Sequence, residues 1–190
     1  MNAVDMDRRA AAGMAEILAM ISADEHSKPT PCPGWSVEDL IAHVLAGNIK
    51  YAEIAMGREW SPGVPAIVVG KDPLDAYRTT VESMLTAWAE PGALDREIGL
   101  PVGRGRAEAA LYIHLGETLV HGWDLAVSTG RSAIFDTDVV EASLGQFRSW
   151  LPATRSGQAP FSDATSIPDD ADAIDRLAAY LGRDVSFRRH

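Results

Sequence analysis

Hydrophobic residues recur at three- and four-residue intervals along most of the chain, which is the spacing of helices with one buried face. The first such segment runs from Met6 to Ile21. Three long helical segments follow at residues 36–57, 72–90 and 106–131, and two shorter ones at residues 136–151 and 168–182. This pattern predicts an all-α fold, a four-helix bundle with additional short helices at its C-terminal end.

Capping signals support these helix boundaries. Ser36 is followed three residues later by Asp39, an acidic variant of the capping box. Asp72 precedes Pro73, a residue that is favoured in the first helical turn. Gly130 is the expected left-handed residue after the fourth long helix.

The segments between the long helices are rich in proline and glycine, which predicts irregular crossings. They cover residues 27–35, 58–73 and 91–106. The run "AIVV" at residues 66–69 could form a strand, but a single run gives no sheet. Arg104 and Arg106 precede a helix and could receive an anion, although a solvated loop is the simpler interpretation.

Length and charge narrow the classes of function. The 190 residues predict a single domain spanning residues 1–190. A net charge of −10 argues against nucleic acid and anionic membranes as partners. The N-terminal segment resembles neither a secretory signal nor a membrane span, so we expect a cytoplasmic protein. Cys32 is the single cysteine, which we interpret as structural; a metal would then be held by histidine and carboxylate.

The segment "HLGETLVHGWDLAVSTG" at residues 114–130 concentrates ionisable side chains on one helix face. With Glu117 at zero and about 100° per residue, His121 lies about 40° round, His114 about 60°, and Asp124 about 20° the other way. The apolar residues beside this face indicate that it turns toward the bundle interior. Buried charges without partners cost several kcal/mol, and a divalent cation would compensate several of them at once.

Glu117 and His121 are four residues apart, so both side chains can reach one ion. His43 lies in the middle of the second helix among apolar residues and is the candidate third ligand. Two imidazoles and one carboxylate leave open coordination positions, as in catalytic metal sites. Alternatively, Glu117 and His121 form a simple ion pair and His43 is a core histidine. For His114 and Asp124 we favour packing or supporting roles over direct metal binding.

Three segments together resemble a known family. They are "TPCPGWSVEDLIAHVLAGN", "HLGETLVHGWDLAVSTG" and "DRLAAYLGRD". They are similar to the actinobacterial metal-binding branch of the DinB/YfiT-like superfamily, which is related to the N-terminal domain of mycothiol-dependent maleylpyruvate isomerase. The resemblance implies an up-down-down-up bundle, frequent dimerisation, and a divalent metal, usually Zn²⁺ and sometimes Ni²⁺. Matched to the family motif, the metal ligands are His43, Glu117 and His121.

The resemblance also bears on function. The isomerase carries a second, C-terminal domain for which this chain has no room, so isomerisation itself is the less favoured activity. The hypothesis is instead a metal-dependent S-transferase, in which the metal activates the thiol of mycothiol for attack on a small electrophile and Asp124 manages protons. The alternatives are a non-catalytic metal-containing bundle that binds or senses a small molecule, and a metal-free helical interaction protein.

Overall fold

The computed structural model describes residues 2–100, 103–155 and 161–189. Within these residues the chain forms six α-helices, two short 3-10 helices (η) and one hairpin. In chain order the elements are α1 (Ala3–Met20), η1 (Ala23–Glu25), α2 (Val37–Ala55), α3 (Pro73–Ala89), β1 (Glu97–Leu100), β2 (Gly103–Arg106), α4 (Glu108–Ser128), α5 (Thr137–Trp150), α6 (Ala173–Tyr180) and η2 (Val185–Arg189).

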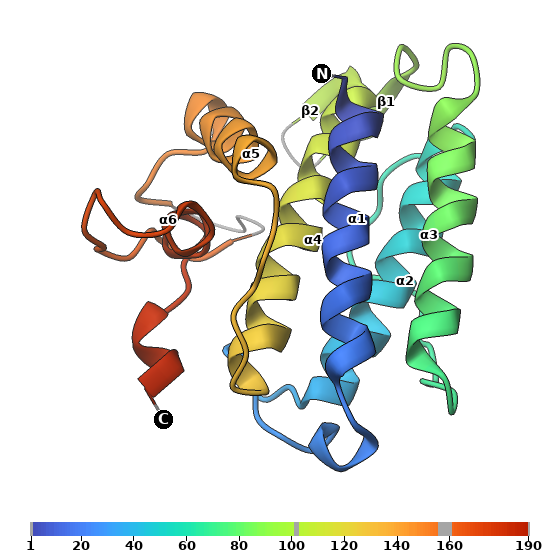
Figure 1. Ribbon diagram of the computed structural model, residues 1–190. Coiled ribbons are helices and arrows are strands. Elements are labelled where there is room, and N and C mark those ends of the chain that lie inside the picture. Colours follow the sequence, from blue (N-terminus) through green and yellow to red (C-terminus); the bar gives the residue numbers. More distant parts are fainter. Residues whose placement is uncertain (1, 101–102, 156–160, 190) are drawn as a thin grey trace.

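The first four α-helices form the predicted bundle (Figure 1). Helices α1 and α4 run in one direction, and α2 and α3 run in the other, so the connection at residues 56–72 carries the chain back along the length of the bundle. Helix α1 packs against α3 and α4, and α2 packs against the same two helices. This is the up-down-down-up order. Helices α5 and α6 lie on the far side of α4, which is therefore covered by packing partners around its circumference.

The predicted caps form as expected. The Ser36 hydroxyl accepts a hydrogen bond from the amide of Asp39 (3.2 Å), and the Asp39 carboxylate accepts one from the amide of Ser36 (2.9 Å). Asp72 accepts from the amide of Asp75 at the start of α3 (3.0 Å). Gly130 follows α4 with a φ of +72°. These contacts satisfy backbone groups that a helix terminus leaves without partners.

The expected irregular crossing at residues 91–106 is wrong in its second half, where β1 and β2 pair as an antiparallel hairpin. Its residues are mostly glycine and charged, so no alternating hydrophobic pattern marks it as sheet. Glu59, in the connection between α2 and α3, accepts from the amide of Gly99 and pairs with Arg104. The Arg104 side chain is 61% exposed, so it forms this ion pair at the surface, in agreement with the solvated interpretation. The run at residues 66–69, which could have been a strand, forms none.

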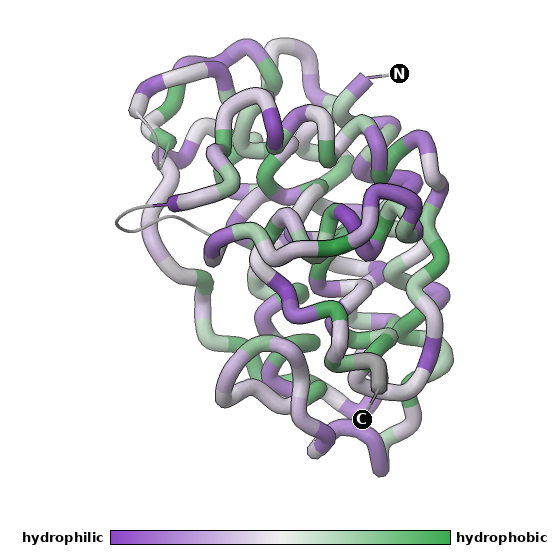
Figure 2. The backbone as a smooth tube through the Cα atoms, turned by 90° about the vertical axis from the view of Figure 1, so that its left-hand side faces the viewer, coloured by the Kyte–Doolittle hydropathy of each residue, from purple (hydrophilic) through white to green (hydrophobic). Residues whose placement is uncertain are grey.

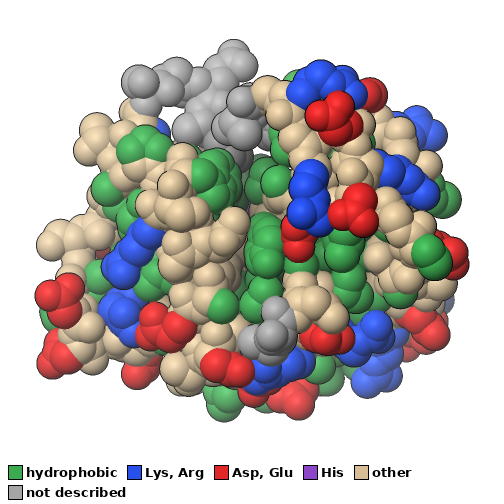
Figure 3. Space-filling model, turned by 90° about the horizontal axis from the view of Figure 1, so that it is seen from above, with side chains coloured by type: hydrophobic (Ala, Val, Ile, Leu, Met, Phe, Trp, Pro, Cys, Tyr) green, Lys and Arg blue, Asp and Glu red, His purple; other side chains and the backbone are tan. Residues whose placement is uncertain are grey.

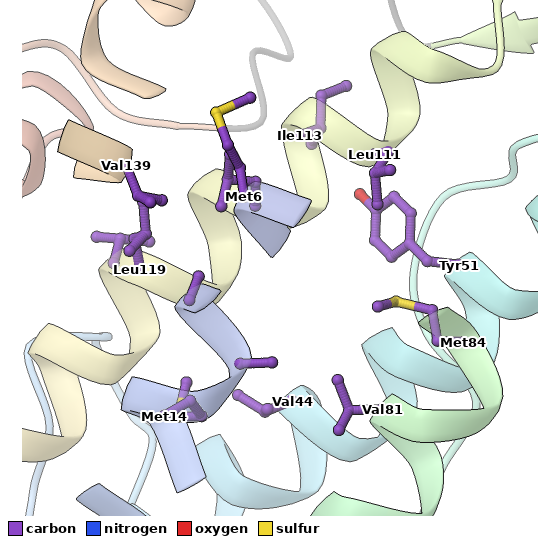
Figure 4. Packing of buried hydrophobic residues seen from close by; sticks show 14 of the residues in the cluster. Met6, Met14, Val44, Tyr51, Val81, Met84, Leu111, Ile113, Leu119 and Val139 are labelled. Carbon is purple, nitrogen blue, oxygen red and sulfur yellow. The ribbon is translucent and has the colours of Figure 1, made fainter. Parts of the chain in front are cut away.

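The core fills the space between the four bundle helices. In Figure 4 the side chains of Met14, Val44 and Val81 meet from α1, α2 and α3, and Tyr51 extends from α2 toward α4. Met14 and Tyr51 are almost completely buried. Hydrophobic and hydrophilic positions alternate along the helical turns in Figure 2, as a one-sided core requires.

The outer surface is mixed in character. Acidic, basic and hydrophobic side chains are interspersed on the face shown in Figure 3. Among the described helices, none combines the length and the apolar character that crossing a membrane requires.

Two close helix contacts depend on glycine. Phe135, in the segment between α4 and α5, lies against Gly13 of α1 and Gly122 of α4, where an added Cβ would come within 2.6 Å and 2.5 Å of its ring. An added Cβ on Gly116 of α4 would collide with the ring of Phe147 in α5. These glycines hold α4 against its neighbours and thereby set the position of its polar face.

We expect Gly116→Ala to lower the free energy of unfolding by about 1–3 kcal/mol, because the aromatic ring is part of a packed core and has little room to move. Urea denaturation measures the change. The matched control is Gly145→Ala in α5, where an added Cβ meets nothing within 4 Å and alanine should stabilise the helix by about 0.5–1 kcal/mol. Equal effects of the two substitutions would contradict this account of α4 packing.

Candidate metal centre

The polar face of α4 is turned inward, as its sequence predicts. His114 is 3% exposed, His121 7% and Asp124 0%. Helices α1 and α2 cover α4 on one side, and α5 and α6 cover it on the other. These three side chains of α4 are therefore buried between helices. Each therefore needs a partner from another part of the chain.

His43, Glu117 and His121 line the same small cavity between α2 and α4. Its volume is about 10 Å³, close to the minimum that one water molecule requires. The rings of His43 and His121 meet edge to face with their centroids 5.0 Å apart. The structure thus brings the three predicted ligands to one pocket, although their role as a ligand set stays a prediction.

The carboxylate that lines this pocket is subject to opposing electrostatic effects. Burial raises the pKa of Glu117, although His121, His114 and Lys50 act in the opposite direction. The Tyr51 hydroxyl donates to the Glu117 carboxylate, which also acts to lower its pKa. Burial lowers the pKa of His43 to about 3, with a further contribution from His121. His43 is therefore neutral, the form in which imidazole binds metals.

A hydrogen bond to Asp124 orients the imidazole of His121. Its Nδ1 lies 3.0 Å from Oδ2 of Asp124 and donates to it, which leaves Nε2 as the nitrogen that can face a ligand. A carboxylate behind the histidine is the usual support of a metal-binding imidazole.

Arg183, which follows α6, binds the other side of Asp124. Its Nε lies 2.9 Å from Oδ1 and its Nη2 2.9 Å from Oδ2, a two-point contact between guanidinium and carboxylate. Although burial acts in the opposite direction, the hydrogen bonds from His121 and Arg183 lower the pKa of Asp124. Asp124 is therefore a buried, ionised carboxylate that holds two side chains in place.

Cys32 also reaches this cluster. Its Sγ lies 3.4 Å from Oδ2 of Asp124 and 3.5 Å from Nη2 of Arg183. Burial and the charge of Asp124 raise the pKa of the thiol to about 12, so the sulfur stays protonated. An inert thiol agrees with the structural role expected for Cys32.

Within the described residues, Cys32, His121 and Asp124 form a group whose ligand atoms all lie within 4.8 Å of one another, so they could hold a metal ion. The expected ligands were histidine and carboxylate alone, and this grouping adds a thiol to the side chains that could bind a metal. Ninety-two positions separate Cys32 from Asp124. Nothing in the local sequence around Cys32 indicates that the crossing at residues 27–35 ends beside α4.

Comparison with known proteins identifies the family and agrees with the fold. Residues 8–126 match the family model of the mycothiol maleylpyruvate isomerase N-terminal domain. The chain belongs to this family. Two curated relatives, uncharacterized proteins from two strains of Mycobacterium tuberculosis, are 31% identical over 179 residues, which cover 94% of this chain and 96% of theirs.

Solved structures show the same bundle. The mycothiol-dependent maleylpyruvate isomerase superposes with a TM-score of 0.56 and 18% identity over 75% of this chain, which spans 66% of that enzyme. A DinB-like protein from Bacillus subtilis, YjoA, superposes with a TM-score of 0.52 and 19% identity over 66% of this chain and 88% of its own. At these identities the likeness establishes the DinB-like helical fold.

The sequence indicated His43 on α2 and Glu117 and His121 on α4. We did not predict Arg183, Tyr51 or Lys50, which surround these residues in the structure. Arg183 lies 59 positions from Asp124, and no periodicity connects them. The segment "DRLAAYLGRD" carries part of the resemblance, and the second of its two arginines, Arg183, is the residue that reaches the site. Tyr51 and Lys50 follow His43 on α2 by two helical turns, a spacing that could have indicated them.

His114 has a different set of partners from its neighbours on α4. Its Nδ1 lies 2.8 Å from Oδ2 of Asp7, and its Nε2 lies 3.1 Å from Oδ1 of Asn48. The amide nitrogen of Asn48 donates to Thr80, whose hydroxyl donates to a backbone carbonyl, and this fixes the amide orientation. Both ring nitrogens therefore face acceptors, so His114 is an imidazolium paired with Asp7. Although burial opposes it, Asp7 raises the pKa of His114 above its usual value.

We expect Asp7→Asn to lower the free energy of unfolding by about 3–5 kcal/mol at pH 6, because it leaves a buried positive charge without its partner. Because the pKa of His114 is higher in the folded than in the unfolded state, its protonation stabilises the fold. This contribution is complete below the unfolded-state pKa of about 6.5 and is lost as the pH rises through the folded-state pKa. The difference between wild type and variant should therefore narrow from pH 6 to pH 9.

Urea denaturation in the presence of a chelator measures this difference without a contribution from bound metal. A difference that stays constant across the pH range would show that His114 is neutral in the folded protein.

Proposed function

We propose that this protein binds one divalent cation, in the first place Zn²⁺, through His43, Glu117 and His121. The cation activates a low-molecular-weight thiol such as mycothiol for attack on a small electrophile. The observation that carries the proposal is the pocket shared by two imidazoles and one carboxylate, those of His43, His121 and Glu117. Membership of the isomerase N-terminal domain family supports mycothiol as the thiol.

Two ligand sets compete for His121, and Arg183 favours the first. A metal ion bound by Cys32, His121 and Asp124 would have to displace a guanidinium that already contacts both Asp124 oxygens and the Cys32 sulfur. It would also need the Cys32 thiolate, which a pKa of about 12 opposes. The carboxylate of Glu117, by contrast, interacts with the hydroxyl of Tyr51 and electrostatically with His121, His114 and Lys50, so a cation bound there need not displace a guanidinium.

The protein's own residues prepare the site. Asp124 and Arg183 hold the His121 ring with Nε2 free, and Tyr51 holds the Glu117 carboxylate. A bound divalent cation would supply Lewis acidity, lowering the pKa of a coordinating thiol so that the thiolate forms near neutral pH. Three protein ligands leave the coordination position that such a thiol needs. Asp124, which is fully buried and already bound on both sides, supports the ligands and does not move protons in this scheme.

We expect His43→Ala and His121→Ala each to reduce bound Zn²⁺ at least tenfold from about one ion per chain, because each removes one of three protein ligands. Cys32→Ser should leave the metal content unchanged, and it serves as the matched control. Elemental analysis of the purified proteins measures the outcome. Loss of the ion in Cys32→Ser, with retention in His43→Ala, would move the site to the other ligand set.

We also expect the Zn²⁺-loaded protein to accelerate the transfer of mycothiol to monochlorobimane. His121→Ala should abolish the acceleration because the thiol loses the cation that stabilises its thiolate. The fluorescence of the bimane adduct measures the rate, and the uncatalysed reaction gives the background. Metal binding without any acceleration would instead indicate a non-catalytic binding or sensing bundle.

A further inference from the structure

A second, larger cavity adjoins the metal pocket. It has a volume of about 500 Å³ and lies between the start of α2 and the connection at residues 56–72. His43 lines both cavities and therefore forms the wall between them. A volume of this size is typical of sites for small organic ligands.

The lining of this cavity is mainly apolar. Val64, Pro65, Ala66 and Ile67 form the wall opposite α2, and Trp35 lies beside His43 with ring centroids 4.8 Å apart. The acidic side chain at this cavity, Asp39, is engaged in the cap of α2. A hydrophobic chain can therefore bury its surface here without leaving a polar group unpaired.

Lys50 fixes the position of this wall. Its ammonium donates to the carbonyl of Gly63 (2.8 Å) and lies 4.5 Å from the ring centroid of Trp60. The next residues along the chain, 64–67, then face α2. Val68 is 92% exposed and points away, which marks the edge of the wall.

We propose that this cavity binds the apolar chain of the electrophile and that Ile67 and Trp35 determine which chain length fits. The inference rests on the proposed function, because it places the substrate beside the metal pocket. The substrate class is a small activated alkene with a hydrocarbon tail, such as a 2-alkenal. The thiol sulfur bonds to the β-carbon as the carbon–carbon π bond breaks, and the thiol proton ends on the α-carbon, so no further reactant is needed.

The first test follows kcat/KM for 2-alkenals of increasing length with mycothiol and the Zn²⁺-loaded protein. Each added methylene that is buried should raise kcat/KM about three- to fourfold until the cavity is full. Ile67→Glu should remove this dependence, because it places a charge in the apolar wall. Val68→Glu is the matched control, since it adds the same charge at the neighbouring exposed position and should behave as wild type.

A second variant, Ala66→Phe, tests the cavity independently in case Ile67→Glu does not fold. Ala66→Phe changes an exposed loop residue at the cavity, so it should fold normally while reducing the space available. It should shorten the longest chain that is accepted and leave the shortest alkenals unaffected. The Zn²⁺ content of all three variants should equal that of wild type, and thermal unfolding shows whether each variant is folded at the assay temperature.

The second test measures binding without turnover. Titration of the metal-free protein with 1-alkanols should change the tryptophan fluorescence, with affinity rising with chain length, and Trp35→Phe should remove the change. Alkanol binding with this dependence, lost in Ile67→Glu, would support the cavity even if no alkenal turned over, and only the proposed function would then fail. Turnover with no chain-length dependence, or with one that Ile67→Glu leaves intact, would overturn the cavity proposal.

Discussion

The burial of charged side chains on the inner face of α4 is the constraint on which the rest of this structure depends. Neighbouring helices cover much of α4, so His114, His121 and Asp124 are buried away from water. Three groups on this face meet a side chain from another element: Asp7 of α1 for His114, Arg183 from beyond α6 for Asp124, and Tyr51 of α2 for Glu117. The bundle order is what brings these distant partners within reach.

The ends of the polar face differ from its middle in how far the charges of the side chains are balanced. His114 and Asp124 have oppositely charged partners at hydrogen-bond distance. Glu117, between them, has hydroxyl and imidazole neighbours and a pKa raised by burial. His114 and Asp124 are thus compensated by charges within the chain and have structural roles. The carboxylate of Glu117 is the group on this face that suits an external cation in the proposed function.

Residues outside the pocket, namely the glycines at the close contacts of α4 and Arg183, hold the polar face of α4 in position. The close contacts of Phe135 and Phe147 at glycines set the position of α4 relative to its neighbours. Arg183 supplies a planar, permanently charged group that binds both oxygens of Asp124, and a lysine could not reproduce that geometry. The short C-terminal helices, which are absent from the four-helix core, therefore contribute to the centre by delivering this residue.

The sequence alone determined the all-α fold, most helix boundaries and the face of α4, because helical periodicity and capping are local properties. It also predicted His43, Glu117 and His121 as a group, through the i,i+4 spacing and the family motif. Only the tertiary structure decided that Arg183 and Cys32 join Asp124, that His114 pairs with Asp7, and that residues 64–67 form a cavity wall beside His43. Those contacts join segments that are far apart in the chain, and no local pattern encodes how such segments meet when the bundle packs.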